Sequence, residues 1–330
     1  MSQPLKFPIY NNHLNLFPKT TIMYDDITFK LLITNQQYAG LNKTLRSLNN
    51  VITREYQNTG IITIQTTYQD CFFSLSPKYL TVAAKLPKLL YGTNQVNFTL
   101  REAKLAISKI QEILCINIGG ARVSRVDLAY NLVMDQPVEN YFKFLCNKDG
   151  MKRWTASNES LYFKSKSGTE LNFYNKTAHL KDTAQEILAE NIDANLLRYE
   201  YRVKSGLAKI VDYHTVTVDD LMDDKFYKLM RELWYDAYKT IDKLSYTPAA
   251  TRIRSVPELK NYLMLDSIDR SGAPATYDLI NSLSFQVSAR VKYNMRKMLK
   301  SLISNPAIND ANDAVAELDS KMLNVFQYAA

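Results

Sequence analysis

The predicted fold depends on Arg125-Val126-Asp127-Leu128-Ala129-Tyr130 and on a later stretch, Leu197-Arg198-Tyr199-Glu200-Tyr201-Arg202. In a β-strand, alternate side chains point to the same face. Each stretch therefore has one apolar face and one charged face, and each charged face combines a carboxylate with arginine. If the two strands are neighbours, Asp127 and Glu200 lie close together. The sequence thus predicts a pair of carboxylates on the polar side of a sheet.

A third strand is predicted between them, at Leu171-Asn172-Phe173-Tyr174-Asn175-Lys176. By the same alternation Tyr174 points to the polar side, and Lys176 lies one step beyond it. A tyrosine hydroxyl beside a phosphate is a nucleophile for phosphoryl transfer, and the lysine would hold the phosphate or lower the pKa of the phenol. Tyr174 and Lys176 are therefore the candidate catalytic residues.

Two carboxylates without a nearby histidine suit a hard cation, so Asp127 and Glu200 are the candidate ligands of Mg²⁺ or Mn²⁺. The neighbouring basic side chains suit phosphate, which makes them candidates for DNA binding. These basic residues are Arg125, Arg198, Arg202 and Lys204. A plainer interpretation is also open: the same residues form an ion ladder between neighbouring strands, which requires no ligand.

The composition indicates a globular chain with a polyanionic partner. Of the 330 residues, 46% are hydrophobic, which excludes a disordered chain. The net charge of +8 favours nucleic acid over an acidic small molecule. The 22 tyrosines can stack on bases, although tyrosine is also common in strands.

Cysteine and histidine usage narrows the chemistry further. Three cysteines without metal-ligand spacing argue against a disulfide framework and fit a reducing cytoplasm. The three histidines are too far apart in sequence for a local metal pair. The first ten residues lack a signal-peptide pattern, and no apolar run is long enough to cross a bilayer. We expect a cytoplasmic protein without a membrane partner.

The order of elements predicts an α+β fold, with an antiparallel sheet and helices packed on one face. The clearest helix begins at Thr99, where Glu102 completes a capping box, and ends near Cys115. Other segments are predicted as follows: an arm at residues 1–18, strands at 20–34, 61–68, 72–75, 79–84, 123–133, 160–166, 169–175 and 196–204, helices at 37–49, 137–145 and 177–190, and an irregular segment at 86–97.

The chain changes character after about residue 215. We predict a catalytic domain at residues 1–215 and a helical region at 216–330 that binds DNA or a partner. Helices are predicted at 218–244, 256–265, 275–283 and 285–303, with a linker at 245–255 and an acidic tail. The last long helix carries candidate DNA-binding residues, namely Arg290, Lys292, Arg296 and Lys297. A solvated basic face is the alternative.

Four motifs in order resemble the gene II protein family, the replication initiators of filamentous phages. Val123-Ser124-Arg125-Val126-Asp127 looks like that family's Ile-Ser-Arg-Ile-Asp strand. Phe173-Tyr174-Asn175-Lys176 is similar to its Tyr-x-Lys segment, and the stretch from Leu197 to Lys204 resembles its Arg-Phe-Glu-Ala-Arg-Ile-Lys strand. Residues 84–94 resemble a Pro-x-Lys…Gly-x-Asn stretch. The resemblance covers roughly residues 79–215.

The resemblance implies a replication initiator that nicks one DNA strand at an origin and starts rolling-circle replication. Tyr174 would form a 5′-phosphotyrosine link and free a 3′-hydroxyl, and a later rejoining step would release a circle. Implied partners are origin DNA, single-stranded or supercoiled, and the host helicase and polymerase, in a bacterial cytoplasm. His179 stands where the family has an acidic residue, so the resemblance assigns no third carboxylate ligand.

Two other functions remain open from the sequence. One is a non-catalytic protein that binds origin DNA with the same fold. The other is a tyrosine relaxase or transposase, which shares the chemistry but acts on another substrate.

Overall fold

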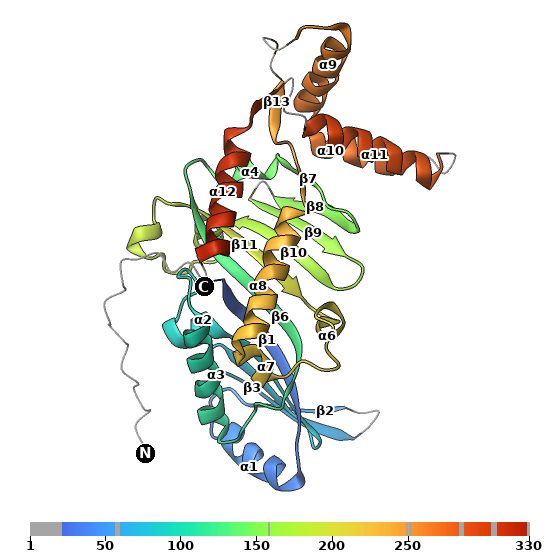
Figure 1. Ribbon diagram of the computed structural model, residues 1–330. Helices are drawn as coiled ribbons and strands as arrows, with labels where there is room; N and C mark the ends of the chain where they lie inside the picture. Colours follow the sequence, from blue (N-terminus) through green and yellow to red (C-terminus); the bar gives the residue numbers. More distant parts are fainter. Residues whose placement is uncertain are drawn as a thin grey trace.

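The computed structural model describes residues 22–56, 60–157, 159–248, 250, 253–283, 287–304 and 309–328. Its main feature is a ten-stranded antiparallel sheet with the order β2-β3-β4-β5-β1-β6-β11-β10-β9-β8 (Figure 1). The strands are β1 (Met23–Leu32), β2 (Ile52–Tyr56), β3 (Ile61–Tyr68), β4 (Cys71–Leu75), β5 (Tyr79–Lys85), β6 (Arg122–Met134), β8 (Met151–Ser157), β9 (Ser160–Ser165), β10 (Thr169–Asn175) and β11 (Asn195–Val203). The predicted α+β class is confirmed.

Strand β6 lies at the centre of the sheet, between β1 and β11. It contains the first of the two stretches that predicted the fold, and β11 contains the second. Both strands alternate as expected: Val126, Leu128 and Tyr199 belong to the hydrophobic core, whereas Asp127 and Glu200 point to the other side of the sheet. The side-chain period of two therefore fixes which face of the sheet is apolar.

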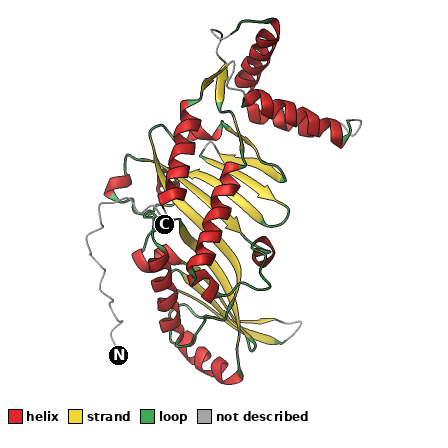
Figure 2. Cartoon of the chain, in the orientation of Figure 1, coloured by secondary structure: helices red, strands yellow, loops and turns green. Residues whose placement is uncertain are grey.

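Helices cover the apolar face (Figure 2). Trp234 of α8 packs on Tyr199 of β11 with ring centroids 4.9 Å apart, and Phe173 stacks on Tyr199 at 4.5 Å. The helices associated with the sheet are α1 (Asn35–Arg46), α2 (Leu86–Tyr91), α3 (Leu100–Leu114), α4 (Glu139–Phe142), α5 (Lys176–Asp182), α6 (Leu207–Ile210), α7 (Val218–Met222), α8 (Asp224–Lys239) and α12 (Asp313–Tyr328).

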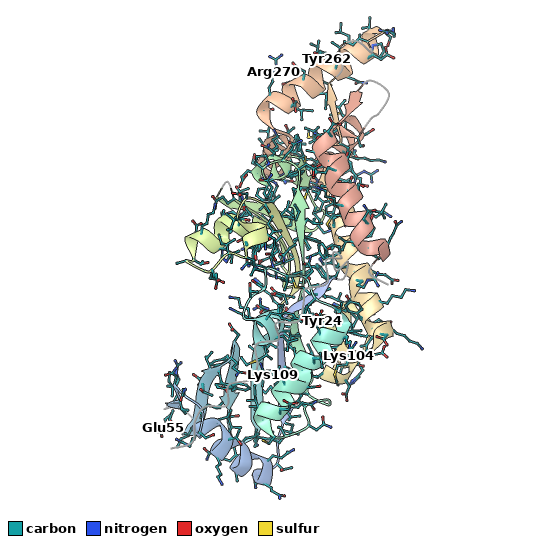
Figure 3. All side chains as sticks on the ribbon, turned by 90° about the vertical axis from the view of Figure 1, so that its left-hand side faces the viewer. Tyr24, Glu55, Lys104, Lys109, Tyr262 and Arg270 are labelled. Carbon is teal, nitrogen blue, oxygen red and sulfur yellow. The ribbon has the colours of Figure 1, made fainter. Side chains whose placement is uncertain are left out.

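The acidic tail forms α12, which returns to the sheet and contributes Leu318, Met322 and Val325 to its core. The core of the sheet thus includes side chains from both sides of the predicted boundary at residues 215 and 216. In Figure 3, α8 and α12 lie on one side of the sheet and α5 lies on the other. The expectation of helices on one face therefore holds for the large helices and not for α5.

A separate helical module extends from one end of the sheet (Figure 1). Its core is a second cluster that includes Leu265, Tyr277 and Leu299. The module consists of α9 (Val256–Ser271), α10 (Ala273–Ser282) and α11 (Ala289–Ile303). Two small sheets connect it to the rest of the chain, namely β7 (Leu145–Asn147) with β12 (Asp242–Lys243), and β13 (Tyr246–Pro248) with β14 (Asn309–Ala311).

Several helix boundaries differ from the predictions, and local chemistry explains the first two of the three cases below. The predicted helix at 218–244 is two helices, because Asp223 has an extended backbone and caps the second one through the backbone amide of Phe226. The segment predicted to be irregular begins with α2, which has Pro87 in its first turn and ends at Gly92 with φ +70°. The helix predicted at 177–190 ends at Asp182 and is followed by a 3₁₀ turn, Ala189–Asn191.

The capping box of α3 is confirmed, since Thr99 accepts from the amide of Glu102 and the Glu102 carboxylate accepts from the amide of Thr99. Strands β2, β7 and β8 and the small strands after residue 240 were not predicted. The predicted arm at residues 1–18 lies outside the described residues, and so does part of the predicted linker. In the described part of the chain, no helix combines the length and apolar character that a membrane span requires.

Candidate active site

The charged faces of β6, β10 and β11 lie side by side in the middle of the sheet. In the strand register, Arg202 is opposite Asp127 and Tyr174 is opposite Arg198. Asp127, Glu200 and Arg198 are almost completely buried, with exposures of 2%, 3% and 0%. The structure therefore brings the two predicted carboxylates, the predicted tyrosine and the arginines onto one polar face.

Strand β1 adds two carboxylates that the sequence had not indicated. The β1–β6 register shifts by one residue between Tyr24 and Ile27. Asp25 and Asp26 consequently lie opposite the single residue Asp127. Such a bulge interrupts the alternation of side chains, so that two successive residues border one site. It provides the third and fourth acidic side chains near the predicted pair.

Arginines are interleaved with these carboxylates. Arg202 Nε donates to Glu200 Oε2 at 2.7 Å and lies 3.7 Å from Asp127 Oδ2. Arg125 Nε donates to Asp127 Oδ1 at 2.9 Å, and its Nη2 lies 3.8 Å from Asp26 Oδ2. These contacts are those of the ion ladder that the sequence left open as the plainer interpretation. Arg202 and Arg125 remain partly exposed at 23% and 35%, so a ligand can reach them.

Arg198 is the innermost cation of the network. Its Nε donates to Glu200 Oε1 at 2.7 Å, and its Nη2 lies 2.6 Å from Asp25 Oδ2 as an ion pair without good hydrogen-bond alignment. Its Nη1 donates to Asn131 Oδ1 at 2.8 Å and to the backbone oxygen of Asn94 at 3.1 Å. With so many fixed partners, Arg198 acts as the rigid support of the site rather than as an open phosphate ligand.

Tyr174 is held within this network. Its hydroxyl donates to Glu200 Oε1 at 2.9 Å, and the side chain is 8% exposed. His179 of α5, an exposed residue, packs edge-on against the Tyr174 ring with centroids 5.4 Å apart. The ring is therefore clamped between a strand and a short helix, while the hydroxyl is directed at a carboxylate.

Lys176 begins α5 directly after the tyrosine strand. It is 2% exposed, and its Nζ donates to Asn94 Oδ1 at 2.7 Å. The segment around Asn94 is joined to the chain after α5, because Gln95 donates to the backbone oxygen of Glu186 at 2.8 Å. These two segments cover the Arg198 end of the polar face, whereas the Arg202 end stays partly open.

The ionisation of the carboxylates follows from burial and charge. Burial acts to raise the pKa of Glu200, but the charges of Arg198 and Arg202 outweigh it and bring the pKa to about 2. Burial raises the pKa of Asp127 despite its arginine partners. The pKa of Asp26 is raised to about 7 by burial and by the nearby charges of Asp25 and Asp127. The cluster therefore contains one firmly ionised carboxylate and one that titrates near neutrality.

Burial also shifts the two candidate catalytic groups. The pKa of the Tyr174 phenol is raised well above its ordinary value by burial and by the charge of Glu200. The pKa of Lys176 is lowered to about 7 by burial and by the charge of Arg198. The phenol is thus protonated in the free protein, and the lysine loses its proton easily. Perturbed groups of this kind concentrate at functional sites, although structural networks produce them as well.

The donors do not converge on a metal ion as they are arranged. The guanidinium of Arg202 lies between Glu200 and Asp127, the two predicted ligands. Among the described residues, no group of three or more His, Cys, Asp or Glu side chains is placed to hold a metal. Mg²⁺ or Mn²⁺ remains a prediction from the sequence.

The other predicted binding residues fall into two places. Lys204 lies at the site, where its Nζ donates to Glu170 Oε2 at 2.9 Å. The basic residues of α11 lie in the outer module, away from the sheet (Figure 1). Lys292 donates to the backbone oxygen of Leu283 at 2.6 Å, and Arg296 donates to Asn281 Oδ1 at 3.1 Å. Both cations therefore bind the end of α10, while Arg290 and Lys297 are exposed.

An open hollow of about 330 Å³ borders the site on the side of β1, β5 and β4. Asp26 and Arg125 line the end nearest the carboxylate cluster, and the rest of the lining includes Lys85, Asp70, Phe72 and Thr67. Its volume lies in the range of small-ligand sites, and its lining combines cations, an aromatic ring and hydroxyls with two carboxylates.

Sequence reasoning missed Asp25, Asp26, Asn94, Asn131 and Glu170. One signal could have found the first two: adjacent acids in an otherwise apolar strand predict a bulge, since one of them would otherwise face the core. The asparagines and Glu170 carry no such signal, because their roles depend on how strands and loops meet. No protein-family model matches the chain, and no curated protein matches it significantly.

Proposed function

We propose that the chain is a DNA strand transferase in which Tyr174 is the nucleophile. The proposal rests on one observation: the hydroxyl of Tyr174 donates at 2.9 Å to Glu200, inside a network whose outer arginines, Arg202 and Arg125, are partly exposed. A phosphodiester that reaches these guanidiniums would lie beside the phenol oxygen. Guanidinium groups bind phosphate oxygens with paired, charge-assisted hydrogen bonds.

The reaction is a transesterification. A bond forms between Tyr174 Oη and phosphorus, and the bond between phosphorus and the 3′ oxygen breaks. The phenol proton passes along the hydrogen bond to Glu200, and the departing 3′ oxygen takes a proton from water; Glu200 then returns its proton to the solvent. No high-energy cofactor is consumed, because one phosphodiester is exchanged for another. The reverse step rejoins the strand.

Arginine movement would couple phosphate binding to proton transfer. In the free protein, Arg198 and Arg202 bring the pKa of Glu200 to about 2, so Glu200 is a weak base. If Arg202 turns from Glu200 to the incoming phosphate, Glu200 loses one of its two cationic partners and its pKa rises. Glu200 then accepts the phenol proton more readily. Lys176, buried next to Arg198, would bind the phosphate in its charged form.

In biological terms we propose a replication initiator that nicks origin DNA and starts rolling-circle replication. The support for this finer assignment is the resemblance of four ordered motifs to the gene II protein family, together with the placement of three of them on adjacent strands around one site. Host helicase and polymerase would follow at the nick, in a bacterial cytoplasm. A relaxase or transposase would use the same chemistry on a different substrate.

A second candidate is a non-catalytic protein that binds nucleic acid with this fold. One observation favours it: Asp25, Asp127 and Glu200 already have arginine partners, and Tyr174 is nearly buried. In that case the network is a structural ion ladder.

The deciding experiment mixes the full chain with labelled single-stranded or supercoiled DNA, with and without Mg²⁺ or Mn²⁺. We expect a protein–DNA adduct that survives denaturant and that disappears in Tyr174→Phe. The matched control is Tyr213→Phe, which alters an exposed tyrosine that packs on Phe226 and not on the candidate site. An adduct of undiminished yield in Tyr174→Phe, or none from the unaltered chain, would rule out the proposal.

A further inference from the structure

An aromatic row, exposed at Trp154 and half-buried at Tyr162, continues the polar face beyond the candidate active site. In the strand register, Trp154 of β8 is opposite Tyr162 of β9, Tyr162 is opposite Asn172 of β10, and Asn172 is opposite Glu200. Cross-strand partners point to the same face of a sheet. The row therefore runs from the sheet edge directly to Glu200, the residue that accepts the hydrogen bond from Tyr174.

The row has the chemistry of a stacking platform. Trp154 is 48% exposed, and its ring centroid lies 5.2 Å from that of Tyr162. The Lys164 ammonium lies over both rings, 4.6 Å from one centroid and 4.8 Å from the other. Lys152, which is exposed, is opposite Lys164 in the register. Aromatic faces bordered by cations bind the bases and backbone of a single strand.

Asn172 adds a second, independent sign of a ligand. It is 2% exposed, and its side-chain oxygen has no hydrogen-bond partner among the described residues. A buried polar atom without a partner costs free energy, so such atoms are normally satisfied by protein, water or a ligand. This oxygen lies on the polar face between Tyr162 and Glu200, where a base stacked on Tyr162 would present its N–H donors.

The charge of the row also suits a polyanion. Glu170 is the acidic side chain of β10 on this face, and three cations share it: Lys204 at 2.9 Å, Arg202 at 3.1 Å and Lys164 at 3.8 Å. Lys152 is a further exposed cation on this edge, so the edge keeps a net positive charge. The other tryptophan, Trp234, is completely buried on the opposite face, whereas Trp154 is exposed to solvent.

We propose that Trp154, Tyr162 and Asn172 bind the bases of the single strand next to the phosphate that Tyr174 attacks. Trp154 and Tyr162 stack on the bases, Asn172 accepts a hydrogen bond from the inner base, and Lys152 and Lys164 neutralise the backbone. The inference rests on the proposed function for the position of the attacked phosphate, but the binding itself requires no chemistry. An edge-protecting role for the Trp154–Lys164 pair is the structural alternative.

The test is equilibrium binding of a fluorescent single-stranded oligonucleotide to full-length protein that carries Tyr174→Phe, so that no covalent step takes part. Trp154→Ala and Tyr162→Ala should each weaken binding roughly ten-fold, the size expected for loss of one stacked base. Trp154→Phe and Tyr162→Phe retain an aromatic face and should bind within about three-fold of the parent. Oligonucleotide should also quench tryptophan fluorescence, and Trp154→Phe should abolish the quenching because Trp234 is buried.

Two outcomes would overturn the platform. One is binding by Trp154→Ala that equals the parent while Phe72→Ala, in the hollow on the other side of the site, weakens it. The other is that Trp154→Ala weakens binding to duplex DNA as much as it weakens binding to the single strand, because the bases of a duplex cannot stack on a side chain. If Trp154→Ala fails to fold, as urea unfolding would reveal, the fluorescence of the parent and of Trp154→Phe still decides the question. A failed adduct assay with intact platform binding would reject the catalytic proposal alone.

Discussion

The hydroxyl of Tyr174 on β10 and the carboxylate of Glu200 on β11 are joined by a hydrogen bond of 2.9 Å on the polar face of the sheet. The two side chains contribute unequally to the stability of the fold. Glu200 is also the anion between Arg198 and Arg202, whereas Tyr174 has its ring packed against His179. Removing the charge therefore disturbs the network more than removing the hydroxyl does.

Glu200→Gln should consequently lower the free energy of unfolding by about 3 kcal/mol, because the buried guanidinium of Arg198 and the partly exposed one of Arg202 both lose an anionic partner. Tyr174→Phe should lower it by only about 1 kcal/mol, the usual net value of one hydrogen bond. Urea unfolding followed by circular dichroism measures both. Equal losses in the two variants would mean that Glu200 is not the centre of the network.

Asp26 should make stability fall as pH rises towards neutrality. Its pKa is about 7 in the folded chain and ordinarily 3.8, so the folded chain holds the proton more tightly. This contribution is complete below pH 3.8 and is lost as pH rises through 7. Asp26→Asn should remove a change of roughly 2 kcal/mol, about half of the full shift because the carboxylate is partly exposed and shares its titration with neighbours. Urea unfolding of the unaltered chain and of Asp26→Asn at pH 4, 5.5, 7 and 8 tests this prediction. The same pH dependence of the free energy of unfolding in both chains would contradict it.

Lys176 should couple DNA binding to proton uptake. Burial and the charge of Arg198 lower the pKa of Lys176 to about 7, and a bound phosphate would raise it again. Affinity for single-stranded DNA should then fall as pH rises from 7 to 9, by up to about ten-fold per pH unit while one proton is taken up. Lys176→Met should bind more weakly at pH 7 and lose this slope.

The control for that measurement is Lys152→Ala, which removes an exposed cation beside the aromatic row. It should weaken binding by a similar factor at every pH. A slope that persists in Lys176→Met would show that another group takes up the proton.

The last helix should be essential to the stability of the sheet. Met322 of α12 is completely buried in the core of the sheet, whereas the next residue, Leu323, is 38% exposed. Met322→Ala should lower the free energy of unfolding by about 3 kcal/mol through lost burial and a residual cavity. Leu323→Ala should cost less than about 1 kcal/mol. A small effect of Met322→Ala would mean that α12 is loosely attached.

The sequence predicted the central strands correctly because their alternation is strong and their charged residues cannot face a core. It therefore also predicted that Asp127, Glu200 and Tyr174 share a face. It did not predict that Arg202 lies between the two carboxylates, because alternation determines the face of a side chain and not its rotamer. For the final helix the sequence predicts only an acidic tail, because its charged residues are more prominent than the apolar residues that pack on the sheet.

Because of the bulge at Asp25–Asp26, the number of acidic residues in β1 can change without moving the apolar residues that pack in the core. Tyr24 and Ile27 both face the core, three residues apart in a strand whose ordinary period is two. Removing one aspartate would restore that period and leave both apolar side chains on the same face. The site can thus gain or lose one acidic group through a single-residue insertion or deletion, without a change of register elsewhere in the sheet.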